Sequence, residues 1–358
     1  MSVPSEDQDA PSAVLLDDAP PGPRGVRLDR NENPYGPGPA ARAVLGVMAN
    51  ELHRYPDPSY RELTGGVARA HGVSEDRVAV GNGADELILL LALARRTDGR
   101  PALICRQTFQ SYALSLAAAG VETRDLALRD WGVDVPAFTR GFADGAGLAF
   151  VCNPHNPTGS LIGSGAVAAL CAAARDNDAV LVLDEAYAEY AGPHFASALP
   201  WATAGNGVCV MRTFSKAHGL AGLRIAYLVG DPAVVQAIRQ VQQAIPFHVN
   251  ALACAAALAA LGDREHVAST VAATARAKCS LVAGFERLGI DCLPSAANFV
   301  LIHLPGRATT TAARLAESGF PVRDVTELGL PDRLRVTVGS RAEVDEFIYT
   351  LGGILADV

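Results

Sequence analysis

The chain has 358 residues, of which 49% are hydrophobic and 19% are charged, and its formal net charge is −8. That length allows one large domain beside a smaller one. The acidic balance, without a basic patch, argues against a nucleic-acid partner, and no apolar run approaches the ~18 residues of a membrane span.

The N-terminal residues 1–29 are rich in Pro, Asp and Ser, and they lack the basic start and apolar core of a secretory signal. We expect them to form a flexible tail. The seven cysteines are an odd number and include no Cys-x-x-Cys pair. They indicate buried thiols in a reducing compartment, so we expect no disulfide, no metal site and a cytoplasmic location.

Short apolar runs alternate with helical patterns from about residue 60 to 230, and these runs predict strands rich in Val, Leu, Ile and Ala. Such strands lack polar alternation because helices cover both faces of a buried parallel sheet. The alternation therefore predicts an α/β domain with a mostly parallel central sheet. The predicted strands lie at residues 77–83, 102–106, 147–154, 179–187, 207–216 and 223–230.

The pattern changes after Pro232, where helices and strands mix as in a smaller α+β domain. A long helical segment over residues 264–289 is expected to join the two domains. The other expected elements are helices at 231–245, 250–262 and 341–355 and strands at 297–304, 320–325 and 333–339.

Residues at the strand ends are candidates for a site, because ligands of open α/β sheets bind at the carboxyl ends of the strands. The turn at residues 81–83 precedes a helix whose first turn holds Ala84 and Asp85. Free backbone N–H groups at that helix start suit a phosphate. An ordinary strand-to-helix connection is the alternative interpretation.

Asn156 stands in a Pro-containing loop, and Asp184 ends an apolar strand with Tyr187 three residues beyond it. A buried carboxylate at Asp184 would need a cationic partner or strong donors, although a helix N-cap explains the residue equally well. Nearby histidines are His155, His218 and His248. Their spacing indicates local contacts rather than a metal site or a catalytic base.

Lys216 is set in RTFSKAHGLAGLRIAY without an acidic neighbour, and Arg224 follows eight residues later. A lysine held away from water loses proton affinity and becomes a usable nucleophile. A chance lysine at a loop edge is the alternative. Together with the candidate carboxylate, the phosphate-ready helix start and the aromatic Phe109, this lysine suits pyridoxal phosphate, which condenses with a lysine and needs an anion beside its ring nitrogen.

The motifs RNENPYG, YPDP, GNGADEL, NPHNPTG, DEAYAEY, RTFSKAHGLAGLRIAY, PFHVN, ANFVLI and LRVTVG occur in this order between residues 30 and 340. With them the chain resembles the fold-type I, class I/II aminotransferases that depend on pyridoxal phosphate, and among these the histidinol-phosphate aminotransferase family. The resemblance implies a large cofactor-binding domain at 51–262, a small C-terminal domain at 263–358, and a segment 30–50 that packs on the small domain.

The resemblance also implies roles for individual residues. Lys216 corresponds to the lysine that bonds to the cofactor aldehyde and carries a proton, Asp184 to the partner of the ring nitrogen, and Tyr187 to a third catalytic residue. The implied cofactor-binding residues are Ala84, Asp85, Phe109, Asn156, Asp184, Tyr187, Thr213, Ser215, Lys216, Arg224 and, reaching across a homodimer interface, Tyr55. The implied substrate-binding residues are Asn33, Tyr35, Arg323 and Arg335.

The implied reaction moves an amino group between a donor, either histidinol phosphate or a similar or aromatic amino acid, and a 2-oxo acid such as 2-oxoglutarate. The chain departs from the family pattern near the substrate, where His155, His218 and His248 replace the usual Asn or aromatic residues. The alternative is therefore a pathway-specific enzyme of the same family: an aromatic amino acid aminotransferase, or an amino-acid decarboxylase, oxidase or cyclase of secondary metabolism.

Overall fold

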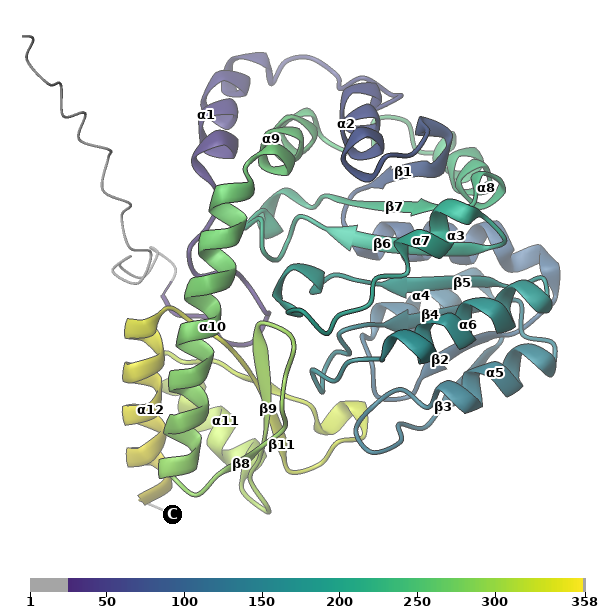
Figure 1. Cartoon of the computed structure of the whole chain (residues 1–358). Coiled ribbons are helices and arrows are strands. Elements are labelled where there is room, and N and C mark those ends of the chain that lie inside the picture. Colours follow the sequence, from purple (N-terminus) through teal and green to yellow (C-terminus); the bar gives the residue numbers. More distant parts are fainter. Residues whose placement is uncertain (1–24, 357–358) are drawn as a thin grey trace, which may run out of the picture.

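The computed structural model describes residues 25–356, and its centre is a sheet with strand order β1-β7-β6-β5-β4-β2-β3 (Figure 1). The strands are β1 (Val78–Gly81), β2 (Ala102–Cys105), β3 (Thr123–Leu126), β4 (Leu148–Cys152), β5 (Val180–Asp184), β6 (Val208–Thr213) and β7 (Ala226–Gly230). Neighbours from β3 to β6 pair in parallel, while β7 is antiparallel to both β6 and β1. The prediction of a mostly parallel sheet is confirmed. β3 was not predicted, because the edge sequence Thr-Arg-Asp-Leu is not an apolar run.

Helices cover both faces of this sheet, and each face has its own hydrophobic cluster. On one face lie α3 (Ala84–Arg95), α4 (Ser111–Ala119) and α8 (Pro232–Gln242), and on the other α5 (Val135–Ala143), α6 (Ser164–Asp176) and α7 (Leu199–Ala204). Along β4, Leu148 and Phe150 belong to the first cluster, whereas Ala149 and Val151 belong to the second. Burial on both sides explains why the strands carry no polar alternation.

The edge strand β1 is protected by α8. The outward backbone carbonyls of Val78 and Val80 accept hydrogen bonds from Arg239 Nη2 at 2.9 Å and from Gln242 Nε2 at 2.8 Å. Covering an edge in this way satisfies polar groups that could otherwise pair with another chain. The same contacts fix β1, which leads directly into the Gly-rich turn before α3.

A smaller sheet, with order β10-β11-β9-β8, is antiparallel throughout. Its strands and helices are β8 (Asp291–Cys292), β9 (Phe299–His303), β10 (Arg323–Asp324), β11 (Arg333–Thr337), α11 (Ala308–Glu317) and α12 (Arg341–Ala356). The long helix α10 (Arg264–Arg287) runs from the large body down to this small one, as Figure 1 shows. The expected α+β character and the long connecting helix are thus present.

Short 3-10 helices also occur along the chain: η2 (Ala49–Glu51), η3 (Glu75–Arg77), η4 (Arg96–Asp98), η5 (Ala188–Tyr190), η6 (Ala221–Leu223) and η7 (Thr326–Leu328).

The segment 30–50, expected to pack on the small domain, divides its contacts between the two bodies. The backbone N–H of Asn31 donates to Thr337 Oγ1 in β11 at 2.9 Å. Beyond it, α1 (Pro39–Met48) packs instead with α2 (Arg61–His71) and α9 (Ala251–Gly262) in a cluster that covers β1 and β7. The alanines of α9 present a small-residue face on which Ala41 and Leu45 of α1 fit.

Leu28, which was expected to lie in the flexible tail 1–29, is part of the fold. Leu28 is 2% exposed in the hydrophobic cluster of the small domain, and its backbone N–H donates to Pro321 O at 3.0 Å. Its carbonyl accepts from Thr337 N at 2.9 Å. Residue 28 therefore belongs to the fold, while residues 1–24 lie outside the described part of the chain.

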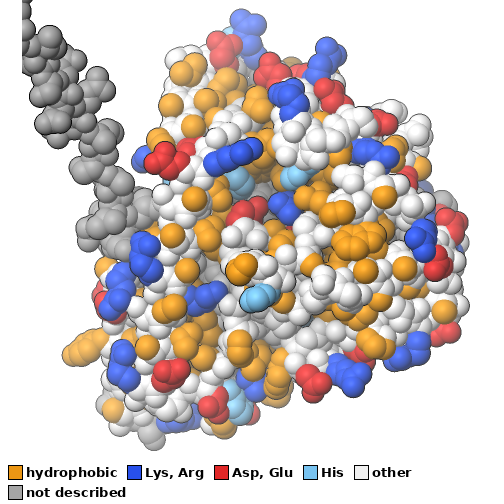
Figure 2. Space-filling view, viewed as in Figure 1, with side chains coloured by type: hydrophobic (Ala, Val, Ile, Leu, Met, Phe, Trp, Pro, Cys, Tyr) orange, Lys and Arg blue, Asp and Glu red, His pale blue; other side chains and the backbone are white. Residues whose placement is uncertain are grey.

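Acidic and basic side chains are interspersed on the face drawn in Figure 2, without a large patch of one sign. Of the helices between residues 25 and 356, none combines the length and the apolar character that crossing a bilayer requires. The expectation of buried thiols holds for Cys105, Cys152, Cys171 and Cys209, whereas Cys254 and Cys292 are partly exposed and Cys279 is exposed.

We predict that Leu28→Ala lowers the free energy of unfolding by about 2–5 kcal/mol, because it leaves a cavity in the small-domain core. The matched control is Leu52→Ala, whose leucine is 67% exposed and whose loss should change stability by less than ~0.5 kcal/mol. Urea unfolding followed by circular dichroism measures both. Equal stability of the two variants would place residue 28 outside the core.

Candidate active site

A cleft of about 530 Å³ opens at the carboxyl ends of β4, β5 and β6 and at the start of α3. The predicted residues that line it are Ala84, Asp85, Phe109, Asn156, Asp184, Tyr187, Thr213, Ser215, Lys216 and Arg224. An adjoining space of about 390 Å³ shares Phe109, Asn156, Tyr187 and Lys216 with it, and adds Arg323 and Arg335. Lys216 therefore lies where the two spaces meet.

The lysine and Arg224 are brought together by a chain reversal. β6 ends at Thr213, which pairs with Ala226 at the start of antiparallel β7. The connecting loop therefore begins and ends at the same place on the sheet edge, so Lys216 and Arg224 both reach the cleft. The eight-residue spacing follows from this geometry.

Lys216 is partly buried at the cleft wall. Its Nζ donates to Arg30 O at 3.1 Å and lies 5.7 Å from the centre of the Tyr187 ring. Burial, followed by the positive charges of Arg335 and Arg224, lowers the pKa of Lys216 to about 8, although the negative charges of Glu32 and Asp184 act in the opposite direction. A large fraction of the amine is therefore neutral near pH 8, which is what a nucleophile or a proton acceptor requires.

Asp184 is a buried carboxylate, 3% exposed, at the end of β5. Its Oδ2 accepts from Tyr112 Oη at 2.5 Å and its Oδ1 from the backbone N–H of Ala186 at 3.1 Å. Burial raises its pKa to about 6, although both donors act in the opposite direction. No basic side chain of the described residues forms an ion pair with Asp184. Its environment thus favours a cationic ligand beside it.

Asn156, Tyr187 and Arg335 form one buried hydrogen-bond network. Tyr187 Oη accepts from Asn31 Nδ2 at 2.9 Å and from Asn156 Nδ2 at 3.3 Å. Asn156 Oδ1 accepts from Arg335 Nη1 at 2.7 Å, which fixes the orientation of the amide. Burial also raises the pKa of Tyr187, so its hydroxyl keeps its proton and remains a donor.

The start of α3 has the features of an anion site. Its N-cap, Gly83, has a φ of 82° and supplies no capping side chain. A Cβ on Gly83 would lie 2.4 Å from Arg224 Nη2, so only glycine lets the guanidinium approach. Arg224 Nη2 donates to Asp85 Oδ2 at 2.9 Å. A cation beside the free N–H groups of a helix start suits phosphate.

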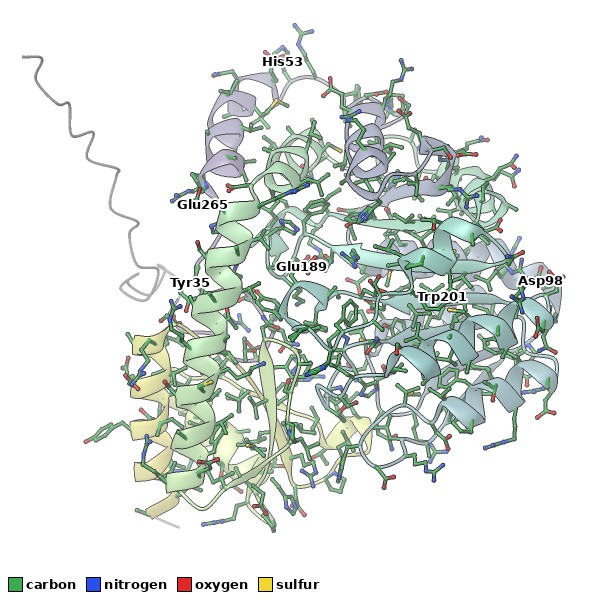
Figure 3. The ribbon with its side chains drawn as sticks, in the orientation of Figure 1. Tyr35, His53, Asp98, Glu189, Trp201 and Glu265 are labelled. Carbon is green, nitrogen blue, oxygen red and sulfur yellow. The ribbon has the colours of Figure 1, made fainter. Side chains whose placement is uncertain are left out.

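Three predicted residues do not line the cleft of this chain. Tyr55 is 83% exposed and stacks on Phe247 with ring centres 4.8 Å apart. Asn33 Nδ2 donates to Ala217 O at 3.1 Å, which ties Asn33 to the loop that carries Lys216. Tyr35 lies near α10 (Figure 3), and its backbone N–H donates to Asn33 Oδ1 at 3.0 Å.

Sequence reasoning missed two residues that orient the site. Tyr112 is fully buried in α4 and bonds to Asp184, but in an apolar helical pattern it is indistinguishable from a core residue. Asn31, with a φ of 54°, is 1% exposed and bonds to Tyr187. Its only signal was its place in the RNENPYG motif.

The histidines make local contacts, as expected, and none of them lines the cleft. Burial lowers the pKa of His155 and of His218 to about 4, so both rings are neutral. His155 Nδ1 lies 2.9 Å from Thr158 Oγ1, and His248 Nδ1 lies 2.6 Å from Glu86 Oε2. Among residues 25–356 no cluster of His, Cys, Asp and Glu has the arrangement of a metal site.

These residues fit pyridoxal phosphate at each of its polar groups. Asp184 offers an anion that prefers a cationic partner, and Lys216 offers a partly neutral amine. The amide of Asn156 and the hydroxyl of Tyr187 are held in fixed orientations by their hydrogen bonds and suit the phenolic oxygen of the cofactor. Arg224 and the helix start supply the phosphate end.

Comparison with known proteins agrees with this fit. A family model described as aminotransferase class I and II matches residues 23–351. Histidinol-phosphate aminotransferase 2 of Pseudomonas fluorescens strain Pf-5 is 37% identical over 334 residues, which cover 92% of this chain and 89% of that protein. The corresponding enzyme of Methylococcus capsulatus strain Bath is 37% identical over 339 residues, covering 93% and 91%.

The fold is also similar to that of a solved aminotransferase structure. The crystal structure of histidinol-phosphate aminotransferase from Sinorhizobium meliloti, in complex with pyridoxal-5'-phosphate, aligns with a TM-score of 0.84 at 26% identity. The alignment covers 99% of this chain and 100% of that one.

We predict that Asp184→Asn stabilises the cofactor-free protein at pH 8. The folded-state pKa of about 6 lies above the ordinary value of 3.8 for an aspartate, so stability falls as pH rises through this window and the ionised carboxylate destabilises the fold above it. Removing that cost should gain on the order of 1–3 kcal/mol at pH 8.

The gain should shrink at pH 4, where the native carboxyl is protonated. Thermal unfolding of cofactor-free protein at both pH values measures it, with Asp130→Asn, whose side chain is 95% exposed, as the control. A destabilised Asp184→Asn variant at pH 8 would contradict the sign.

Proposed function

We propose that this chain, which belongs to the class I and II aminotransferase family and to its histidinol-phosphate aminotransferase branch, transfers the amino group of histidinol phosphate to a 2-oxo acid such as 2-oxoglutarate. As a member of the family it is a pyridoxal-phosphate-dependent aminotransferase. The observation that supports the proposed donor is the pair of arginines, Arg323 and Arg335, in the space that adjoins Lys216 and lies beside the cofactor cleft.

Pyridoxal phosphate, when bound, supplies an electron sink for the charge that develops at the donor's Cα. We assign the proton transfer to Lys216 Nζ, whose pKa of about 8 is matched to an operating pH near neutrality. Asp184 would keep the ring nitrogen of the cofactor protonated, and Tyr112 holds Asp184 in place through its 2.5 Å hydrogen bond. Asn156 and Tyr187 would donate to the phenolic oxygen of a bound cofactor, and Phe109, which lines the same cleft, would pack against its ring.

We assign the phosphate end of the cofactor to the N–H groups of Ala84 and Asp85 together with Thr213, Ser215 and Arg224. The substrate end is assigned to Arg335, which is 9% exposed and has a buried Nε without a hydrogen-bond partner among the described residues. That unused donor supports a role in gripping an anionic group of the substrate. Arg323 lines the same space and adds a second positive charge.

We further propose that the enzyme is a cytoplasmic homodimer, in which Tyr55 of one subunit completes the phosphate site of the other. The exposed Tyr55 and the nearby Phe247, which is 38% exposed, support an interface at this surface. Asn33 and Tyr35 are assigned to the segment that covers the site, since Asn33 is bonded to the loop that carries Lys216.

A donor comparison tests the function. With 2-oxoglutarate as acceptor, we expect kcat/KM for histidinol phosphate to exceed that for phenylalanine or tyrosine by about 100-fold, because a site built for an anion loses that contact with an aromatic side chain. Glutamate formation measures turnover, and bleaching of the cofactor absorbance measures the half-reaction. Lys216→Ala should lower turnover with every donor by at least about 10³-fold. A preference for aromatic donors would overturn the proposed substrate, and parental turnover of the lysine variant would overturn the role of Lys216.

We predict that Glu327→Gln lowers KM for a phosphorylated donor. Glu327 Oε1 forms an ion pair with Arg323 Nη2, and Gln110 lies beside them. A bound phosphate must compete with this carboxylate, so its removal should lower KM about three- to tenfold at low salt with kcat unchanged.

The control is Glu317→Gln, which alters an exposed residue of α11. Steady-state kinetics with histidinol phosphate at low and at high ionic strength measures both variants. An unchanged KM would remove Arg323 from the list of residues that bind the phosphate.

A further inference from the structure

His248 is linked to the turn that begins α3 by two short hydrogen bonds. His248 Nδ1 lies 2.6 Å from Glu86 Oε2, and the same oxygen accepts from the backbone N–H of Asn82 at 2.6 Å. The His248 side chain is 6% exposed and that of Glu86 is 16% exposed. Glu86 is therefore an acceptor shared between the histidine ring and the Gly81–Gly83 turn.

The turn has little freedom apart from this contact. Gly83 N donates to Gly81 O at 2.8 Å, and a Cβ on Gly81 would lie only 2.6 Å from Leu87 Cγ. With the N–H groups of Asn82 and Gly83 used inside the turn, those of Ala84 and Asp85 remain at the helix start that faces the cleft. If the Glu86 carboxylate moved, the backbone N–H of Asn82 would lose its acceptor, and the direction of the N–H groups of Ala84 and Asp85 would change with the turn.

We propose that His248 is a positioning residue for the cofactor phosphate and that it acts through Glu86. In this arrangement the imidazole N–H of His248 holds the Glu86 carboxylate where it can accept from the backbone N–H of Asn82. The fixed Asn82 in turn sets the direction of the N–H groups of Ala84 and Asp85. The proposal rests on the assignment of the phosphate to this helix start, and it does not depend on which amino donor the enzyme uses.

The position of the ring is itself fixed by packing. The edge of Tyr60 meets His248 at 87° with ring centres 5.1 Å apart, and Tyr60 Oη accepts from Val249 N at 3.2 Å. A purely structural role for His248 in this packing is the competing explanation. It predicts a general loss of stability, whereas positioning predicts a loss confined to ligands that carry a phosphate.

Comparing pyridoxal phosphate with pyridoxal, which lacks the phosphate, separates the two explanations. His248→Leu removes the donor to Glu86, and we expect the Kd of the cofactor-free protein for pyridoxal phosphate to rise about tenfold, as expected for a hydrogen bond to a charged group. The Kd for pyridoxal should stay within about twofold. His248→Asn, whose amide N–H can stand where Nδ1 stands, should restore the Kd for pyridoxal phosphate to within about threefold of the parent.

The control is His194→Leu at an exposed histidine, and absorbance titration gives each Kd while thermal unfolding reports folding. His248→Ala takes the place of the Leu variant if the latter does not fold. Equal losses for the two ligands, an unchanged Kd for pyridoxal phosphate, or failure of His248→Asn to restore it would each overturn the positioning role.

Discussion

Two ionisable groups, the partly buried Lys216 and the fully buried Asp184, lie at one edge of the sheet, and the site depends on the cost of withdrawing their charges from water. Burial lowers the pKa of Lys216 to about 8 and raises that of Asp184 to about 6, so each group is pushed toward its neutral form. Their positive and negative charges do not cancel this cost, because burial is the largest cause of both shifts. A bound cofactor relieves this cost, because it offers Asp184 a cationic partner and Lys216 an aldehyde with which the neutral amine can react. The destabilisation of the empty site thereby contributes to affinity for the cofactor.

The backbone topology explains how one loop contributes to both ends of the cleft. A parallel sheet needs long crossovers, whereas the antiparallel step from β6 to β7 returns the chain to the same edge. Lys216 and Arg224 flank this return and therefore lie on the same side of the sheet as Asp184. The apolar composition of residues 223–230 predicted a strand, but strand direction is set by the connection, which apolar composition does not encode.

The residues that could be predicted are those whose chemistry is visible within a short motif. Lys216, Asp184 and Asn156 stand at strand ends or in loops where a polar residue needs an explanation, and the cleft contains all of them. Tyr112 could not be predicted, because a tyrosine inside an apolar helix is usually part of the core and its partner lies 72 residues away in the sequence. Leu28 was assigned to the tail for the complementary reason, since its neighbours in sequence are polar while its contacts come from residues 321 and 337.

The loop after α8 connects the phosphate end of the cleft to the outer surface. Its residue His248 is bonded to Glu86 under the α3 turn, and the preceding Phe247 stacks on the exposed Tyr55. In the homodimer that we propose, Tyr55 reaches across the interface to the site of the other subunit. The loop that carries Phe247 and His248 then lies between the local phosphate site and the contact with the partner. Because Phe247 has a φ of 63°, which is costly for a bulky residue, the surrounding contacts must hold this conformation. The loop thus combines a contact to the phosphate end of the cleft, through His248, with a strained residue, Phe247, that packs on the exposed Tyr55.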